Sequence, residues 1–151
     1  MNFTNTTIGL ACDHTGFEFK EFIKKHLEKR GLTYKDFGAY SAERSDYPDF
    51  AHQLSEAIEK NELEMGIALC GTGNGMAIAL NKFRFIRAGL AWNEEIARLV
   101  SAHNNANVLV IPARFVSLDE VVKIVDAYLD APFEGGRHLE RLNKINVMSI
   151  E

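Results

Sequence analysis

Five short apolar runs alternate with five amphipathic segments along the chain, and this alternation restricts the fold more than any other feature. The apolar runs cover residues 7–12, 33–38, 65–70, 86–92 and 107–112. Segments with apolar residues at helical spacing follow them, over residues 15–31, 47–62, 73–81, 93–103 and 117–130. Parallel neighbours need a crossover connection, so five strands that are each followed by a helix predict a parallel sheet with helices on both faces. The prediction is one three-layer α/β domain over residues 1–151, with a C-terminal extension after residue 130.

The predicted helices carry boundary signals of their own. Thr15 and Glu18 have the spacing of a capping box, and Gly31 is placed to end the first helix. Pro48 falls in the first turn of the second helix, where proline is tolerated. The last predicted helix begins with a second capping box, from residue 117 to residue 120.

The composition excludes several classes of protein. With 46% hydrophobic and 25% charged residues, the chain is typical of a folded domain. Its formal charge of −4 provides no basic field for nucleic acid, although a few local cations suffice for one phosphorylated small molecule. No apolar run approaches the length of a membrane span, and the start of the chain lacks the apolar core of a signal peptide. Because two cysteines favour a reducing compartment, we expect a cytoplasmic protein.

Polar and reactive groups follow the predicted strands. They lie in residues 12–14, 38–46, 70–75, 92–93 and 112–114. In an open parallel sheet, ligands bind outside the carboxyl ends of the strands, near the switch in strand order. We therefore expect the functional site at this edge.

The segment CGTGNG, residues 70–75, forms the most unusual of these strand ends. It is not a P-loop, since the chain has no Gly-Lys pair, and it lacks the third glycine of a dinucleotide fingerprint. A tight glycine turn at a helix start can point several backbone N–H groups at a phosphate or at an oxyanion formed during a reaction. The same environment is expected to lower the pKa of Cys70, which makes the thiol a candidate nucleophile or general base. The alternative is that Cys70 is a small apolar strand residue.

Five segments resemble, in order, the motifs of the type B ribose-5-phosphate isomerases, whose superfamily includes galactose-6-phosphate isomerase subunits. The segments are ACDHTGFEFK, DYPDFAH, GIALCGTGNGMAIALNK, HNNANVLVIPARFV and FEGGRHLERLNKI, and the resemblance runs from about residue 8 to residue 146. It implies a Rossmann-like α/β/α sandwich with a five-stranded parallel sheet and a helical C-terminal extension. It also implies a homodimer or a dimer of dimers with active sites at the subunit interface.

The resemblance implies an aldose–ketose isomerase that interconverts ribose 5-phosphate and ribulose 5-phosphate through a cis-enediolate, without a cofactor or a metal. Cys70 would be the base, Thr72 would move the proton on oxygen, and His103 would open the sugar ring. The enediolate would be held by the N–H groups of the turn, at Gly71, Gly73, Asn74 and Gly75.

The remaining site residues are implied substrate contacts. Asp13 and His14 match the residues that contact sugar or phosphate, and Asn104 matches a further substrate contact. Arg114 and a C-terminal group of Arg137, His138 and Arg141 would bind the phosphate, with the C-terminal arginine pair supplied by the neighbouring subunit. Arg137 and Arg141 are four residues apart, which places them on one face of a helix.

Two positions depart from the family pattern. Phe85 stands where glycine is usual, and we expect it to alter a turn or to pack as a local plug; Ala91 often corresponds to cysteine. Three alternatives to the pentose reaction stay open. They are isomerisation of a six-carbon sugar phosphate such as allose or galactose 6-phosphate, a non-catalytic module that binds a phosphorylated sugar, and a redox switch between Cys12 and Cys70.

Overall fold

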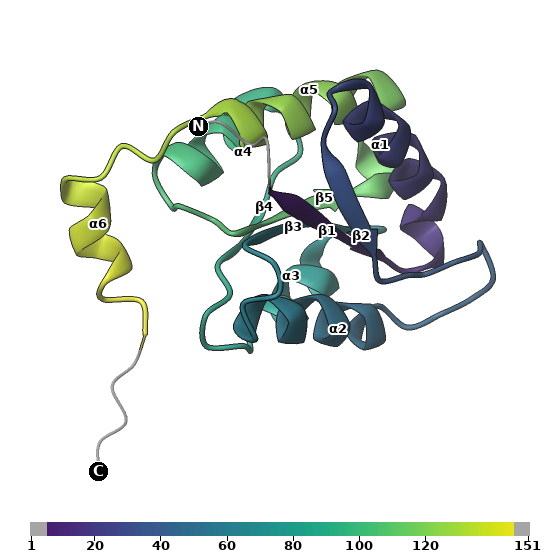
Figure 1. The fold of residues 1–151 in the computed structure, drawn as a ribbon, viewed down its shortest axis with the longest axis horizontal. Coiled ribbons are helices and arrows are strands. Elements are labelled where there is room, and N and C mark those ends of the chain that lie inside the picture. Colours follow the sequence, from purple (N-terminus) through teal and green to yellow (C-terminus); the bar gives the residue numbers. More distant parts are fainter. Residues whose placement is uncertain (1–5, 147–151) are drawn as a thin grey trace, which may run out of the picture.

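The computed structural model describes residues 6–146, and its strands and helices follow one another in the predicted order (Figure 1). One parallel sheet has the strand order β2-β1-β3-β5-β4. The strands are β1 (Thr7–Cys12), β2 (Thr33–Asp36), β3 (Met65–Cys70), β4 (Ala88–Leu90) and β5 (Val108–Pro112). The predicted parallel α/β fold is confirmed. The order of the strands reverses beside β1, so a ligand site is expected at the carboxyl ends of β1 and β3.

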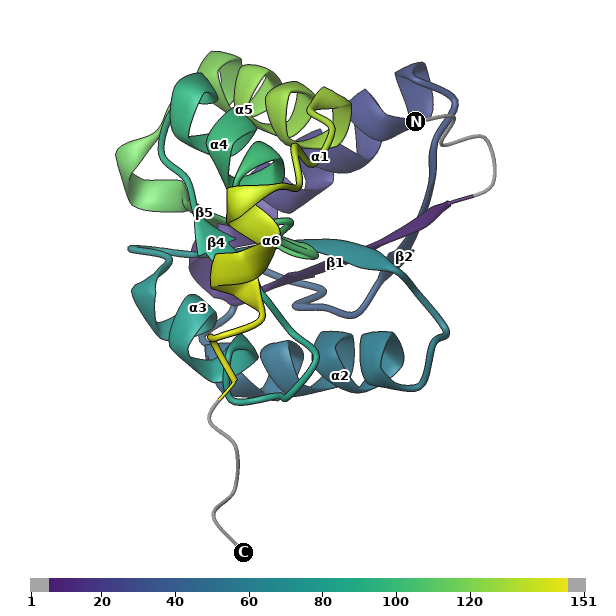
Figure 2. The same cartoon turned by 90° about the vertical axis from the view of Figure 1, so that its left-hand side faces the viewer.

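Helices cover both faces of the sheet (Figures 1 and 2). One face carries α1 (Phe17–Lys29), α4 (Glu94–Ala102) and α5 (Leu118–Asp130). The other face carries α2 (Tyr47–Glu59) and α3 (Asn74–Leu80). Two short 3-10 turns, η1 (His14–Gly16) and η2 (Ala113–Phe115), follow β1 and β5. No helix within residues 6–146 is long and apolar enough to cross a membrane.

The two layers of helices explain the burial of the strands. β5 is buried throughout, and β1 and β3 are buried from their second residue onward. The edge strands differ, because each pairs on one side only: β2 alternates between exposed and half-buried residues, and β4 is half-buried. The expectation of apolar strands buried on both faces thus holds for the three central strands alone.

The helix starts agree with the sequence in part. The predicted capping box of Thr15 and Glu18 is wrong, because Asp13 caps η1 instead and α1 begins at Phe17 without a side-chain cap. The second capping box is confirmed, since the side chains of Ser117 and Glu120 each accept a hydrogen bond from the other residue's backbone N–H.

Two strands are shorter than their apolar runs. β2 ends at Asp36 rather than at residue 38, and β4 covers three residues of the predicted 86–92. Ala91 still donates a backbone hydrogen bond to Val110, but Trp92 turns away and is half exposed. Phe85 is 58% exposed, so it does not pack as a local plug within the described chain, and its expected effect on a turn stays a prediction.

The C-terminal extension contains a short helix, α6 (Arg137–Leu142), which lies apart from the α/β body (Figures 1 and 2). Its connection to the body includes a backbone hydrogen bond of 2.9 Å from the Glu134 N–H to the Ala102 carbonyl at the end of α4. Leu139 on α6 and Ile145 after it are about half exposed. This part of the chain therefore presents apolar side chains that the body does not cover.

Candidate functional site

Cys70 is the last residue of β3 and pairs with Pro112 at the carboxyl end of β5. Its side chain belongs to the core between the sheet and helices α2 and α3, and 4% of the residue's surface is exposed. The thiol is therefore held at a fixed point directly before the glycine turn.

The turn after Cys70 has a backbone conformation that requires glycine. Gly73 has a φ of +76°, and the Leu90 side chain and the backbone N of Pro112 lie where a side chain at this position would point. Asn74 donates its N–H to the Thr72 hydroxyl at 3.3 Å. Within residues 6–146, the backbone N–H groups of Gly71, Thr72, Gly73 and Gly75 donate no hydrogen bond. Four donors in this turn are thus left without a partner in the described chain, two of them at the buried residues Gly71 and Gly73.

Asp13 and His14 follow β1, the neighbour of β3, and lie beside this turn. The Asp13 N–H donates to the carbonyl of Leu69, the residue before Cys70, at 3.4 Å, and the Asp13 carboxylate is buried. The His14 ring is held by Ser45, whose backbone N and O lie 3.3 and 3.2 Å from Nδ1. The His14 N–H also donates to the Ser45 hydroxyl at 3.1 Å.

Arg114 comes from η2 and reaches the same turn. Its N–H donates to the Gly71 carbonyl at 3.0 Å. Its guanidinium group lies about 3.2 Å from the point that a Cβ of Gly71 would occupy. This exposed arginine, with no salt bridge inside the described chain, can receive an anionic group next to the turn.

Tyr47 is a candidate that the sequence reasoning missed. Its phenol oxygen lies 2.7 Å from the point that a Cβ of Gly75 would occupy, so the hydroxyl stands over the turn. Its sequence position could have indicated this location. Tyr47 stands directly before Pro48 at the start of α2, and a helix that follows β2 begins at the carboxyl edge of the sheet.

The other predicted residues gather elsewhere. His103 is the C-cap of α4, and its ring stacks on that of His138 with centroids 4.1 Å apart and an angle of 11° between the planes. Asn104 follows it and is exposed. Arg137 and Arg141 are both exposed on α6, beside this pair of imidazoles.

One chain therefore holds the predicted site in two groups. The carboxyl-edge group contains Asp13, His14, Cys70, the turn 71–75 and Arg114, and the amino-edge group contains His103, Asn104, Arg137, His138 and Arg141. The amino-edge group lies where the chain enters β5 at Val108, whereas Cys70 lies at Pro112, where β5 ends. The four residue steps from Val108 to Pro112 span about 13 Å. The two groups of one chain are therefore separated by more than the length of a five-carbon sugar phosphate.

Cys12 cannot partner Cys70 in a disulfide as the strands are arranged. Cys12 is opposite Leu69 in the β1–β3 register and shares the core under α1, α4 and α5, whereas Cys70 points to the other face. Burial raises the pKa of the Cys12 thiol to about 11, against a smaller opposing effect of the Lys20 charge. The alternative of a redox switch between these two cysteines is therefore not supported.

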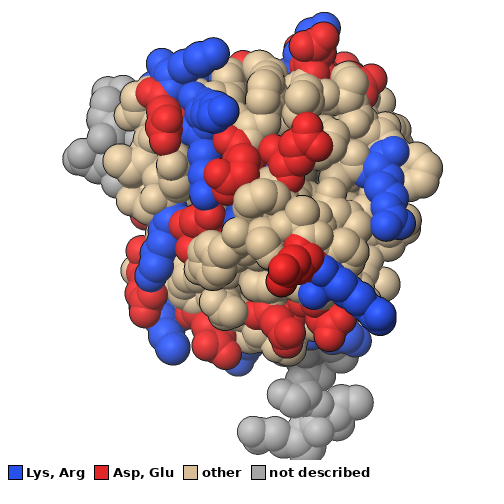
Figure 3. All heavy atoms as spheres, turned by 90° about the vertical axis from the view of Figure 1, so that its right-hand side faces the viewer, with Lys and Arg blue, Asp and Glu red and all other residues tan. Residues whose placement is uncertain are grey.

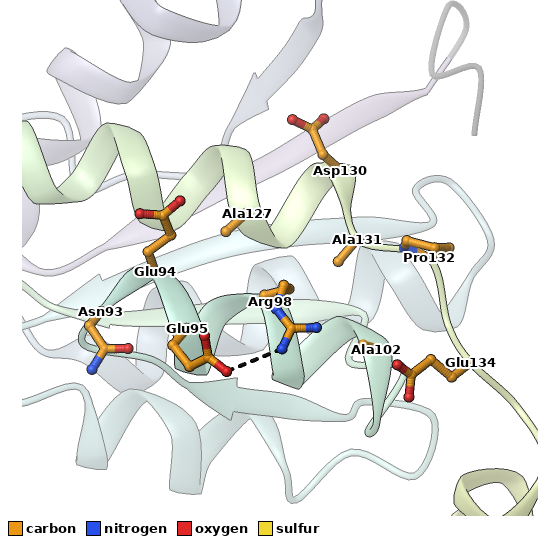
Figure 4. Close-up of a pocket in the computed structure, with 10 residues that line it drawn as sticks. All are labelled: Asn93, Glu94, Glu95, Arg98, Ala102, Ala127, Asp130, Ala131, Pro132 and Glu134. Carbon is orange, nitrogen blue, oxygen red and sulfur yellow. Dashed lines mark hydrogen bonds and ion pairs between the residues drawn. The ribbon is translucent and has the colours of Figure 1, made fainter.

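A cavity of about 680 Å³ between the ends of α4 and α5 is a separate feature (Figure 4). Four carboxylates line it, from Glu94, Glu95, Asp130 and Glu134, and its single arginine, Arg98, is paired with Glu95 at 3.1 Å. A phosphate dianion would be repelled here, and none of the predicted site residues lines this cavity. Figure 3 shows the side of the molecule that lies on the right in Figure 1, where basic and acidic side chains are interspersed.

The chain matches the family model described as Ribose/Galactose Isomerase over residues 8–145. The chain belongs to the ribose/galactose isomerase family. The family resemblance and the isomerase class expected from the sequence motifs are thereby confirmed.

Individual members of the family are similar over almost their whole length. Ribose-5-phosphate isomerase B of Escherichia coli is 44% identical over 141 residues, which are 93% of this chain and 95% of that protein. The crystal structure of a ribose 5-phosphate isomerase from Thermotoga maritima has a TM-score of 0.90 and 47% identity, covering 93% of this chain and 97% of that one. Ribose-5-phosphate isomerase B from Mycoplasma genitalium with bound ribulose-5-phosphate has a TM-score of 0.89 and 42% identity, covering 94% and 95% of the two chains.

Proposed function

We propose that the protein interconverts ribose 5-phosphate and ribulose 5-phosphate, with the Cys70 thiolate as the base. The observation that carries the proposal is the position of Cys70 directly before a turn in which four backbone N–H groups have no partner among residues 6–146. Membership of the isomerase family supports the reaction class, and the relative with bound ribulose 5-phosphate supports the substrate.

The reaction moves one proton between two carbons. The hydrogen on C2 of the open-chain aldose is weakly acidic, so its removal needs a placed base and a means to stabilise negative charge on oxygen. The Cys70 sulfur takes the proton from C2 and returns it to C1, while the electron pair stays within the substrate as a cis-enediolate. The N–H groups of the turn hydrogen-bond the oxyanion, and the Thr72 hydroxyl transfers the proton between O1 and O2.

Ring opening precedes this step, because ribose 5-phosphate is mainly a closed furanose. His103 donates a proton to the ring oxygen, a role that suits an imidazole near neutral pH. Asn104 binds the sugar beside it. Asp13 and His14 fix the sugar from the side of Cys70.

A complete site needs two copies of the chain. Since the carboxyl-edge and amino-edge groups lie at opposite ends of the sheet, we propose a homodimer in which each site takes one group from each subunit. Arg137 and Arg141 then bind the substrate phosphate together with Arg114 of the other copy. The uncovered apolar residues Leu139 and Ile145 are suited to this contact.

The test compares the two cysteines as a matched pair. Cys70→Ala should lower kcat for ribose 5-phosphate by about 10²- to 10⁴-fold, the range for loss of a general base. Cys12→Ala, on the opposite face of the sheet, should keep kcat within about twofold, since the site loses no group that touches substrate. Full turnover by Cys70→Ala would refute the assignment of the base.

Two further readouts separate the alternatives. A six-carbon specificity would appear as a higher kcat/KM for allose 6-phosphate than for ribose 5-phosphate. A binding module would hold ribose 5-phosphate but exchange no hydrogen at C2 in heavy water. The proposed function requires the higher kcat/KM for the pentose, and it requires exchange.

A further inference from the structure

We infer that Glu134 is a positioning residue that holds the His103 ring in the orientation needed to open the sugar. The inference rests on the proposed function, in which His103 is the ring-opening acid. Glu134 was not among the residues that the sequence motifs assigned to the site.

The contacts of Glu134 join the end of α4 to α6. Its backbone N–H donates to the Ala102 carbonyl at 2.9 Å, which fixes the residue beside His103. Its carboxylate oxygen Oε2 lies 3.4 Å from Nε2 of His103 and 3.4 Å from Nε2 of His138. Figure 4 shows the carboxylate next to Ala102 at the end of α4.

A metal ion is the first alternative for such a cluster. The three ligand atoms lie within 4.8 Å of one another, close enough to share one ion. However, an imidazole nitrogen binds a metal along its lone pair, which lies in the plane of the ring. The two rings are stacked nearly parallel with centroids 4.1 Å apart, so an ion in the plane of one ring lies outside the plane of the other. An ion pair needs no such alignment with the ring plane, so the arrangement favours a carboxylate that acts on the imidazoles through its charge.

The surroundings of His138 favour an interaction of the Glu134 carboxylate with His103 rather than with His138. Burial of His138, followed by the charges of His103 and Arg137, lowers its pKa, so His138 is neutral near neutral pH. A neutral ring can stack on an imidazolium without the repulsion that two charged rings would feel at 4.1 Å. In the proposed reaction the ring that carries the proton is that of His103, so the Glu134 charge acts on that ring.

The carboxylate also decides which nitrogen of His103 acts on the sugar. Because Nε2 lies at ion-pair distance from Glu134, Nδ1 is the nitrogen left to act on the sugar. Within the described part of the chain, Nδ1 of His103 has no hydrogen-bond partner, and about a third of the side chain is exposed. Glu134 thus orients the ring through its charge, while the substrate meets the opposite nitrogen.

The experiment separates ring opening from carbon chemistry. Ribulose 5-phosphate cannot form a furanose ring, because its O5 carries the phosphate. Exchange of its C1 hydrogen with deuterium oxide therefore needs the base but no ring opening. Glu134→Gln should slow net conversion of ribose 5-phosphate about 10- to 100-fold, the usual effect of removing such an orienting partner. The same variant should exchange the C1 hydrogen of ribulose 5-phosphate within about twofold of the wild-type rate.

Controls make each outcome decisive. Glu140→Gln changes an exposed carboxylate on α6 that contacts neither imidazole, and it should keep both rates. Glu134→Asp keeps the charge and should recover part of the net rate. Equal loss of conversion and exchange in Glu134→Gln, or no loss of conversion, would overturn the inference. Cys70→Ala tests the proposed base separately. In this variant the exchange of the C1 hydrogen of ribulose 5-phosphate should be lost, whether or not Glu134 positions His103.

Discussion

Cys70 and His103 lie at opposite ends of β5 in one chain, although the proposed reaction needs both. A mixed dimer tests whether two copies bring them together. A heterodimer of one Cys70→Ala chain and one His103→Ala chain, isolated with two affinity tags, has one site with both substitutions and one with neither. We expect about half the wild-type kcat per dimer, whereas each homodimer of a variant is strongly impaired. A heterodimer as inactive as its parents would show that both residues of a site come from the same chain.

Replacement of Gly73 should disturb stability and activity together. Gly73→Ala forces a side chain into a backbone with a φ of +76° and against Leu90, which should cost about 1–3 kcal/mol of unfolding free energy. The turn would shift, so kcat should also fall. Gly31→Ala is the matched control, because Gly31 has a φ of +71° but no atom within 4 Å of the added methyl group. It should lower the midpoint of urea unfolding by strain alone and leave kcat unchanged.

Loss of Arg137 should weaken binding of the phosphate. Arg137→Met removes a charge-assisted contact worth about 1.5–3 kcal/mol, which corresponds to a rise in KM of about 10- to 150-fold. The chemistry lies at the other end of the substrate, so kcat should change less. Arg98→Met, on α4 and paired with Glu95, serves as the control and should leave KM unchanged. Equal KM values for the two variants would remove Arg137 from the site.

The buried ion pair between Lys20 and Asp36 should make stability depend on acid pH. Burial acts to raise the pKa of Asp36, but hydrogen bonds from Lys20, Lys24 and the Gly38 N–H outweigh it and lower the pKa below the usual value. A carboxyl group with a lowered folded-state pKa stabilises the fold above its unfolded pKa of about 4, and this stability is lost as the pH falls further.

Asp36→Asn should therefore destabilise the protein at pH 7 by about 3–5 kcal/mol, because it leaves the fully buried Lys20 without its counter-charge. Urea unfolding at pH 7 and pH 3 measures both effects, and the difference between wild type and variant should shrink at pH 3. A difference that is constant with pH would contradict the role of the Asp36 charge.

The order of elements could be predicted because each strand and helix has its own periodicity, and local residues such as Ser117 and Glu120 set helix starts. The limits of the edge strands could not, since they depend on pairing: β4 pairs with β5 over Ala88–Leu90 only. The capping role of Thr15 was wrong because its own N–H and its hydroxyl both donate to the Asp13 carboxylate, which caps η1 instead.

The candidate site was predictable residue by residue but not in its division between two edges of the sheet. The motif around His103 gives no indication of which end of the sheet it occupies. Topology supplies the answer: α4 runs back from the end of β4, so its last residue lies where β5 begins. Glu134 was missed for a related reason, since its contact with His103 links residues 31 positions apart.

All five strands and the helices that cover them are complete at Asp130, before the α6 arginines occur in the sequence. In the proposed site, the connector of residues 131–136 sets where the phosphate sits relative to the reacting carbons, yet it contributes no strand or covering helix to the core. Insertions or deletions in this connector could retune the family for sugars of different length during evolution, with the folded body left untouched.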